Sequence, residues 1–223
     1  MNSKEQVFAI SPGWAILTVV VVFVLSIFLG AFFFRFFGVG LALVFGEMLI
    51  ALIPFGYMLY KRIDIKRYIG FEVKLKYILL GISFGAFLLL FNVVINGILV
   101  SIFGTSEAVQ ESNALILNTS NSAEGLILVV AALSLAGICE EFTFRGFLQT
   151  SINSKYSLVV ALVVSSLAFG FFHFDPQAVY TLSAFLMGLL LGFIYHHWHS
   201  YVVSATAHAT MNLIVLAVLL LIP

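Results

Sequence analysis

Long apolar runs alternate with short polar segments along the whole chain. Seven of these runs approach or exceed the roughly 20 residues that a helix needs to cross a bilayer. The predicted spans are 14–34, 41–60, 77–103, 125–149, 157–174, 177–195 and 201–221. The first run is longer than the apolar region of a signal peptide, so it is interpreted as a span. The pattern predicts an all-α, polytopic membrane helix bundle with about seven transmembrane helices, forming a single transmembrane domain over residues 1–223.

Composition excludes a soluble domain. Of the 223 residues 62% are hydrophobic and 9% are charged, and the mean hydropathy is +1.16. Ten basic and ten acidic residues give a net charge of zero, so there is no electrostatic case for a nucleic-acid partner. The expected partners are the lipid bilayer and membrane-associated molecules.

The distribution of basic residues predicts the orientation in the membrane. The segment Lys61 to Lys76 holds six of the ten Lys and Arg residues, and the positive-inside rule makes it cytoplasmic. Because two spans precede this segment, the N-terminus is also predicted to be cytoplasmic. The segment Gly104 to Glu124 has three Glu residues and no Lys or Arg, so it is predicted to lie on the outer side.

Several polar residues fall inside the predicted spans. Asn92 and Asn96 lie one helical turn apart and are expected to form interhelical hydrogen bonds. For Glu47 two interpretations stay open: a third intramembrane carboxylate, or a group near the end of a span that pairs with Arg35 or water. The single cysteine, Cys139, is expected to be a small buried residue.

Two further segments are assigned to structure rather than chemistry. Asp175 and Pro176 indicate the start of a helix, as an N-cap followed by proline at the first helical position. The run from His196 to His199 is interpreted as an interfacial belt rather than as a metal-binding tract.

The chemistry is concentrated at residues 137–146, where two carboxylates and an arginine lie inside an apolar run. Each ionised group at the membrane centre costs about 2.5–3.5 kcal/mol on insertion scales. On a helix Glu141 and Arg145 share a face and are expected to form an ion pair. Glu140 points about 100° away on such a helix and lacks that partner, so it is the group left to act as a general base.

Two other spans offer partners for Glu140. His173 ends the run 157–174, and His208 lies one turn before Asn212 in the last run. One Glu and two His can bind a catalytic zinc or activate water directly, and Asn can stabilise an oxyanion. The sequence therefore allows a metal set of Glu140, His173 and His208, with zinc as the candidate cofactor, although the H-E-x-x-H pattern is absent.

Four motifs in order resemble the CAAX-protease and bacteriocin-processing family of intramembrane endopeptidases, which includes the type II endopeptidase that processes prenylated proteins. The motifs lie between residues 140 and 212, inside the motif-bearing core 125–221. They are Glu140-Glu141-x-x-x-Arg145, Phe169-x-x-x-His173, Phe185-x-x-Gly188-x-x-x-Gly192 and His208-x-x-x-Asn212.

The resemblance implies roles for these residues. Glu140 and His173 would activate water, Glu141 and Arg145 would support the site, and His208 and Asn212 would stabilise the tetrahedral oxyanion. Phe185, Gly188 and Gly192 are assigned to helix packing, because glycine allows close backbone approach.

The resemblance also leads to a predicted activity. We expect a site that opens to the cytoplasm and cleaves a membrane-associated substrate, either prenylated at a CAAX end or bacteriocin-like. The short segment between His173 and His208 differs from eukaryotic members and favours a prokaryotic cell membrane. Counted from the turns, His208 lies nearer its own turn than the other two groups, so either the turn near Lys155 projects from the membrane or a span is broken.

Two other functional classes stay open at this stage. Buried Glu and His residues also mark proton-coupled transporters and channels. A catalytically idle membrane adaptor or immunity protein would instead bind a partner helix through the face that carries Gly188 and Gly192.

Overall fold

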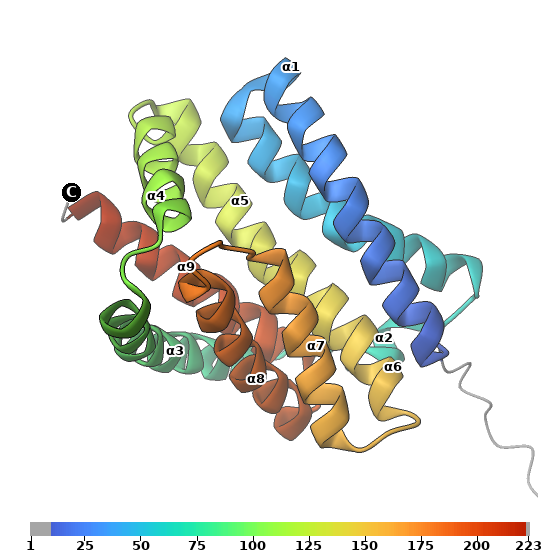
Figure 1. The fold of residues 1–223 in the computed structure, drawn as a ribbon. Helices are drawn as coiled ribbons and strands as arrows, with labels where there is room; N and C mark the ends of the chain where they lie inside the picture. Colours follow the sequence, from blue (N-terminus) through green and yellow to red (C-terminus); the bar gives the residue numbers. More distant parts are fainter. Residues whose placement is uncertain (1–9, 222–223) are drawn as a thin grey trace, which may run out of the picture.

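The computed structural model describes residues 10–221, and every regular element within them is a helix (Figure 1). In chain order the elements are α1 Pro12–Tyr60, α2 Ile65–Tyr68, α3 Leu75–Phe103, α4 Glu107–Thr119, α5 Ala123–Glu141, the π-helix η1 Phe142–Gln149, α6 Thr150–Asn153, α7 Leu158–Phe172, α8 Val179–Trp198 and α9 Tyr201–Leu221. The all-helical prediction is confirmed. The predicted cytoplasmic N-terminal segment lies mostly outside the described residues.

Helix α1 is a hairpin with two arms. A straight helix of its 49 residues would be about 70 Å long, more than twice the hydrocarbon core of a bilayer. Gly38 interrupts it with φ 79° and ψ 172°, a conformation open essentially to glycine. The rings of Phe33 and Phe45 stack across this turn with centroids 4.8 Å apart. The two arms correspond to the predicted spans 14–34 and 41–60.

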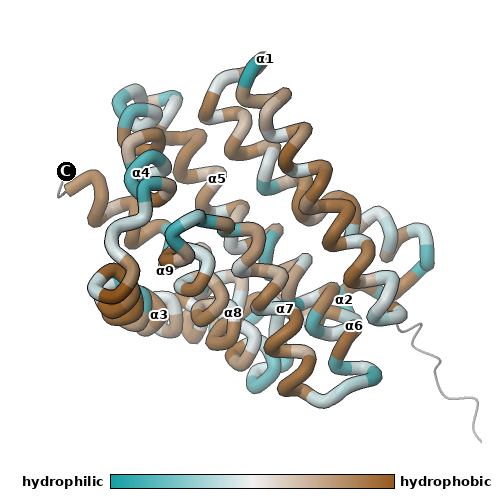
Figure 2. Tube along the Cα trace, viewed as in Figure 1, coloured by the Kyte–Doolittle hydropathy of each residue, from teal (hydrophilic) through white to brown (hydrophobic). Residues whose placement is uncertain are grey.

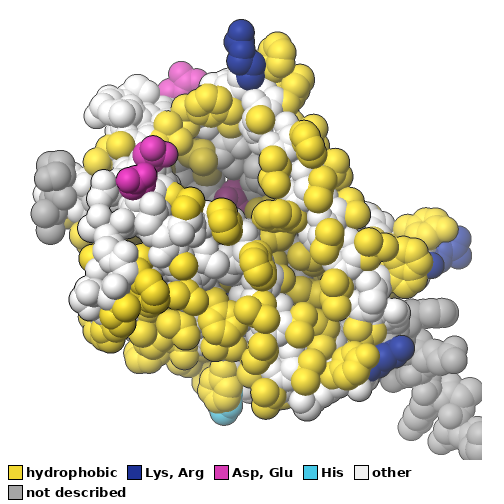
Figure 3. Space-filling model, in the orientation of Figure 1, with side chains coloured by type: hydrophobic (Ala, Val, Ile, Leu, Met, Phe, Trp, Pro, Cys, Tyr) yellow, Lys and Arg dark blue, Asp and Glu magenta, His cyan; other side chains and the backbone are white. Residues whose placement is uncertain are grey.

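Within residues 10–221, five helices are long and apolar enough to cross a membrane: α1, α3, the continuous rod from α5 to α6, α8 and α9. Hydrophobic side chains cover much of the surface, and the hydrophilic positions gather mainly at the turns (Figures 2 and 3). The chain is therefore an integral membrane protein. The number of crossings stays a prediction, because α1 has two arms and α7 is short.

Helix α7 ends inside the bundle. Its 15 residues extend about 22 Å, which is less than the thickness of the hydrocarbon core. The chain turns at Asp175, whose carboxylate accepts hydrogen bonds from the backbone N–H of Gln177 at 3.2 Å and Tyr180 at 2.8 Å. The prediction of Asp175 as N-cap with Pro176 at the first helical position is wrong, because α8 begins at Val179 with Ala178 as its N-cap. The Asp175 carboxylate instead holds the turn before the helix and the first turn of α8.

The bundle has two chemically different ends, separated by α3, whose 29 residues extend about 43 Å. The basic end contains residues 61–76 and the α8–α9 turn, which are joined by a 3.3 Å hydrogen bond from Tyr201 N–H to the Gly70 carbonyl. At this end Lys74 donates to Glu72 at 2.8 Å, and the bond raises the pKa of Lys74. The acidic end contains residues 104–124, where α4 forms a helix that the polar composition did not reveal.

Small residues let the helices around the site approach closely. A Cβ atom on Gly137 of α5 would lie 2.4 Å from the backbone nitrogen of Ala209 in α9. A Cβ atom on Gly188 of α8 would lie 3.0 Å from the Cβ of Ser166 in α7. The packing role predicted for Gly188 agrees with this geometry.

We predict that Gly137→Ala destabilises the protein by about 1–3 kcal/mol, because the added methyl group meets backbone that cannot move aside. The matched control is Gly97→Ala in α3, where a Cβ atom has no neighbour within 4 Å. Thermal unfolding in detergent micelles measures both. Equal melting temperatures for the two variants would contradict the close α5–α9 packing.

Candidate active site

The two site carboxylates lie where α5 changes from α-helical to π-helical hydrogen bonding. Residues 142–149 form η1, and Thr150 Oγ1 donates back to the Arg145 carbonyl at 3.1 Å. Thr143 Oγ1 anchors this segment to α1 by donating to the Ile50 carbonyl at 2.9 Å. The predicted span 125–149 lies within a continuous helical rod, Ala123–Asn153, but its last eight residues are π-helical rather than α-helical. Single-turn π-bulges are frequent at functional sites, but an eight-residue π segment has no signal in the sequence pattern.

The predicted ion pair between Glu141 and Arg145 is confirmed. Arg145 Nη1 lies 3.0 Å from Glu141 Oε1, and both side chains are at most 1% exposed. Arg145 Nη2 also donates to the Gly188 carbonyl at 3.2 Å. The guanidinium carbon lies 4.4 Å from the ring centroid of Phe169, within cation–π range. One arginine therefore joins η1, α7 and α8.

Two histidines from different helices converge on Glu140, as the sequence predicted. His173 Nε2 lies 4.0 Å from Glu140 Oε1, and His208 Nε2 lies 3.7 Å from Glu140 Oε2. Each ring is held through its other nitrogen. His173 Nδ1 lies 2.9 Å from the Phe169 carbonyl, and His208 Nδ1 lies 3.2 Å from Glu141 Oε1. A proton on each Nδ1 satisfies these contacts and directs Nε2 of both rings toward Glu140.

His208 bridges the two carboxylates, which the sequence analysis did not predict. Its Nδ1 contacts Glu141 and its Nε2 faces Glu140, so one imidazole connects the ion-paired carboxylate with the unpaired one. Glu140 Oε2 is buried and has no hydrogen-bond donor among the described residues. A buried carboxylate oxygen without a donor needs an explanation, and a reacting water or substrate provides one.

The ring of Phe169 packs against the rings of both site histidines. Its ring centroid lies 4.7 Å from that of His173 and 5.8 Å from that of His208. Tyr180 meets the other side of His173 edge-on at 5.0 Å. The sequence motif includes Phe169. The contacts of the Phe169 ring with Arg145 and both histidines are visible only in the tertiary structure.

A cavity of about 150 Å³ adjoins the histidines and is lined by His173, His208 and Asn212 among others. Asn212 Nδ2 donates to the Leu133 carbonyl at 3.4 Å, which directs the carboxamide along the cavity wall. The oxyanion-stabilising role expected for Asn212 stays a prediction.

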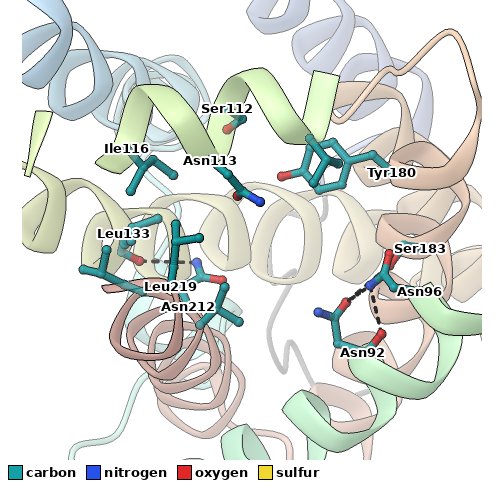
Figure 4. A pocket seen from close by; sticks show the side chains of 13 residues that line it. Asn92, Asn96, Ser112, Asn113, Ile116, Leu133, Tyr180, Ser183, Asn212 and Leu219 are labelled. Atoms are coloured by element: carbon teal, nitrogen blue, oxygen red, sulfur yellow. Dashed lines mark hydrogen bonds between the residues drawn. The ribbon is translucent and has the colours of Figure 1, made fainter. Parts of the chain in front are cut away.

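A second cavity of about 310 Å³ continues from the first toward α4 (Figure 4). Asn96 Nδ2 donates to Asn92 Oδ1 at 2.7 Å, and Ser183 Oγ of α8 donates to the same oxygen at 3.3 Å. The interhelical bond predicted for the asparagine pair is thus present through Asn92. Both asparagines also line the second cavity.

The cavities lead away from the basic end. On the basic side of the carboxylates, Arg145 and Gln149 are at most 2% exposed, and Gln149 Nε2 donates to the Gly192 carbonyl at 2.9 Å. Two further cavities, of about 250 and 590 Å³, lie at the basic end, so the opening of the site toward the cytoplasm stays a prediction. Helix α7 is unbroken over Leu158–Phe172, close to the predicted run 157–174, and it ends directly before His173.

Glu47 belongs to the surroundings of the site. Its Oε2 is buried without a hydrogen-bond partner among the described residues. The structure shows no ion pair between Glu47 and Arg35 within residues 10–221; the Arg35 guanidinium lies 6.0 Å from the ring of Phe36. Pairing with Arg35 is thus not observed, and both an intramembrane carboxylate and a carboxylate paired with water stay predictions.

The donor set of Glu140, His173 and His208 was tested for metal binding. Zinc requires ligand bonds of about 2.0–2.2 Å to one carboxylate and two imidazole atoms. Within residues 10–221 no group of three or more His, Cys, Asp or Glu side chains is arranged to hold a metal ion. This also holds for His196 and His199, whose rings lie 5.3 Å apart. The residues as placed do not fit a metal.

We predict that Arg145→Met destabilises the protein by about 3–5 kcal/mol, because it leaves the buried Glu141 charge without compensation. Thermal unfolding in detergent measures the change. Lys74→Met is the control, because it removes one side of the exposed Lys74–Glu72 pair and is expected to have little effect. A similar small effect for both variants would contradict the structural role of the buried pair.

Comparison with known proteins gives a family match that covers the helices of the site. No curated protein and no solved structure matches the chain. The family model described as "Type II CAAX prenyl endopeptidase Rce1-like" matches residues 122–214, which include α5, η1, α7, α8 and most of α9. The family resemblance inferred from the four motifs is thereby confirmed, and residues 122–214 carry an Rce1-like domain.

Proposed function

We propose that the protein is an intramembrane endopeptidase in which Glu140 activates a water molecule. The family match supports peptidase activity in general. The observation that carries the proposal is the convergence of His173 Nε2 and His208 Nε2 on the Glu140 carboxylate, at 4.0 and 3.7 Å. These distances exceed a direct hydrogen bond, and a water beside the pair bonds to both Glu140 and His173.

The first step is attack on the peptide carbonyl. The water oxygen bonds to the carbonyl carbon while Glu140 accepts the water proton, so that the carbonyl oxygen becomes an oxyanion. His173 Nε2 accepts a hydrogen bond from the same water and fixes its position. In this scheme Asn212, which lines the same cavity as both histidines, donates a hydrogen bond to the oxyanion.

The second step breaks the bond between carbon and nitrogen. Protonated Glu140 returns the proton to the leaving nitrogen as the carbonyl re-forms, and the products are a carboxylate and an amine. Glu141 and Arg145 do not touch the reacting atoms in this scheme. They are positioning residues, because the ion pair holds His208 through Nδ1.

The substrate and membrane assignments rest on the motifs and on charge. We propose a membrane-associated peptide or protein substrate, of the prenylated CAAX or bacteriocin-like type. The short segment between His173 and His208 favours a prokaryotic cell membrane, and the basic loop places that loop and the N-terminus in the cytoplasm in this proposal.

We predict that Glu140→Gln lowers proteolysis by about a hundredfold to ten-thousandfold, the usual contribution of a general base. His173→Ala is expected to fall in the same range. The measurement is mass spectrometry of membrane peptides from cells that carry each variant, which reveals the substrate together with its loss of cleavage.

The matched control is Glu107→Gln on α4, which replaces an exposed carboxylate by the same amide. It is expected to cleave like the unaltered protein. Unchanged peptide patterns in folded, membrane-inserted Glu140→Gln and His173→Ala variants would overturn the proposal.

We also predict that activity survives exhaustive chelation, because the three candidate ligands do not form a metal-binding group. Elemental analysis of the purified protein should then give less than one zinc per chain. Stoichiometric zinc that disappears in His208→Ala, together with inactivation by chelators, would show instead that the ligands rearrange around a metal.

A further inference from the structure

The smaller of the two cavities at the basic end lies where three segments of the chain meet. It has a volume of about 250 Å³ and is lined by the basic loop, by the end of the rod from α5 to α6, and by the end of α8. We propose that this cavity binds the phosphate group of an anionic phospholipid from the adjoining leaflet. The proposal does not depend on the peptidase function, because Glu140, His173 and His208 do not line this cavity.

The cavity lies at the level of the membrane surface. Two of the helices that are long and apolar enough to cross a membrane end beside it, the rod Ala123–Asn153 and α8. Asn153 and His196, in the last turns of these helices, both line the cavity. In Figure 1, α2 and α6 lie at this same end of the bundle. Because a spanning helix ends where the hydrocarbon meets the headgroups, the cavity is at the depth of lipid phosphates.

The lining offers hydrogen-bond donors and cationic groups. The Arg67 guanidinium has five N–H donors, so it can bind a ligand in addition to other partners. The side chains of Asn153, His196 and His199 make no hydrogen bond with another described residue. None of the described residues that line the cavity is Asp or Glu. Donors without acidic neighbours suit a phosphate group, because charge-assisted hydrogen bonds hold its oxygens.

The floor of the cavity is fixed by hydrogen bonds within the protein. Gln149 is 2% exposed, and its Nε2 donates to the Gly192 carbonyl at 2.9 Å. The Tyr195 hydroxyl lies 2.8 Å from Thr150 Oγ1 and 3.3 Å from the Ile69 carbonyl. The polar groups of the floor therefore have protein partners, and the donors nearer the rim are left for a ligand.

The basic loop and the α8–α9 turn are held together at the cavity. Gly70 has a φ of 64°, and a Cβ atom there would overlap the carbonyl oxygen of His199, so the approach requires glycine. His199 itself has a left-handed φ of 45°. Its ring centroid lies 5.3 Å from that of His196. The backbone thus brings two imidazoles together at the cavity before any ligand binds.

The charge around the cavity favours an anion. Residues 61–76 contain six Lys and Arg residues and two acidic residues, so their formal charge is +4. Both acidic side chains have partners within this segment: Asp64 accepts from the Arg67 backbone N–H at 3.2 Å, and Glu72 pairs with Lys74 at 2.8 Å. Clusters of about four to eight Lys and Arg residues beside the ends of spanning helices are typical of anionic lipid binding.

Helix ends provide a simpler explanation of the basic side chains. The helices α2, α6 and α8 all end at the cavity, and cationic groups stabilise the C-terminal ends of helices. If this were their whole role, removing them would lower the stability of the protein and leave its lipid content unchanged. Asn153 carries no charge, so its position among the donors points to a ligand instead.

The test is native mass spectrometry of the full chain, which identifies the lipids that the protein retains. The protein is incubated in neutral detergent with an equimolar mixture of phosphatidylglycerol and phosphatidylcholine. His196→Gln combined with His199→Asn removes both imidazoles, and asparagine tolerates the left-handed backbone at position 199. Asn153→Asp places a negative charge at an exposed position of the rim, where it does not disturb packing.

Matched controls separate the cavity from the overall charge. Asn121→Asp makes the same exchange at an exposed position of the acidic end. Arg67→Gln removes one positive charge from the lining, and Lys76→Gln removes one from the basic loop outside the cavity. The melting temperature of each variant is measured in the same detergent.

The proposal expects the unaltered protein to retain phosphatidylglycerol about tenfold more than phosphatidylcholine, because hydrogen bonds to charged groups usually contribute that much. The cavity variants should lose this preference, and Asn121→Asp and Lys76→Gln should keep it. Equal losses in cavity variants and controls would show attraction by diffuse charge alone. Lower melting temperatures with unchanged lipid retention would show the helix-end role alone. Either result would overturn the proposal.

A separate experiment distinguishes the lipid from a free ion as the source of the phosphate group. Inorganic phosphate is added to the protein in place of the lipid mixture, and the melting temperature is measured again. If inorganic phosphate raises the melting temperature of the unaltered protein but not of Asn153→Asp, while phosphatidylglycerol is not retained, the cavity binds a free anion and the lipid proposal is wrong.

Discussion

The buried ion pair between Glu141 and Arg145 is the interaction on which the other features of the site depend. It neutralises a carboxylate in an apolar bundle, where an uncompensated charge would cost several kcal/mol. The same arginine reaches the Gly188 carbonyl and the Phe169 ring, so it positions α8 and α7. The same carboxylate holds His208. Glu140 can face two imidazoles because its neighbour carries the structural role.

The geometry of the backbone decides what surrounds this pair. The π-helical segment η1 broadens the rod just after the carboxylates, and the short α7 ends at the depth of the site. A full-length α7 would fill the acidic end of the bundle, and the histidine at its end would lie near the membrane surface. The shortened helix instead gives His173 a backbone carbonyl for Nδ1 and leaves a polar cavity beyond it.

The two ends of the bundle differ in how their side chains pack. At the basic end, Gln149 packs tightly against Gly192 of α8, beside cavities of about 250 and 590 Å³. At the acidic end, α4 lies beside a cavity of about 310 Å³ whose lining includes four asparagine side chains. Hydrolysis in a bilayer requires both features, because water must reach Glu140 while the bundle still satisfies its buried polar groups.

The sequence by itself determined the helical class, the Glu141–Arg145 pair and the family resemblance, because apolar run length and i,i+4 spacing are local properties of a helix. It also marked His173 and His208 as partners of Glu140. Only the tertiary structure decided that His208 bridges both carboxylates, that Glu47 is buried, and that the cavity beside the histidines continues toward α4. These features depend on how helices far apart in the chain are placed, and the hydrophobic pattern of a membrane helix, apolar all round, carries little information about that placement.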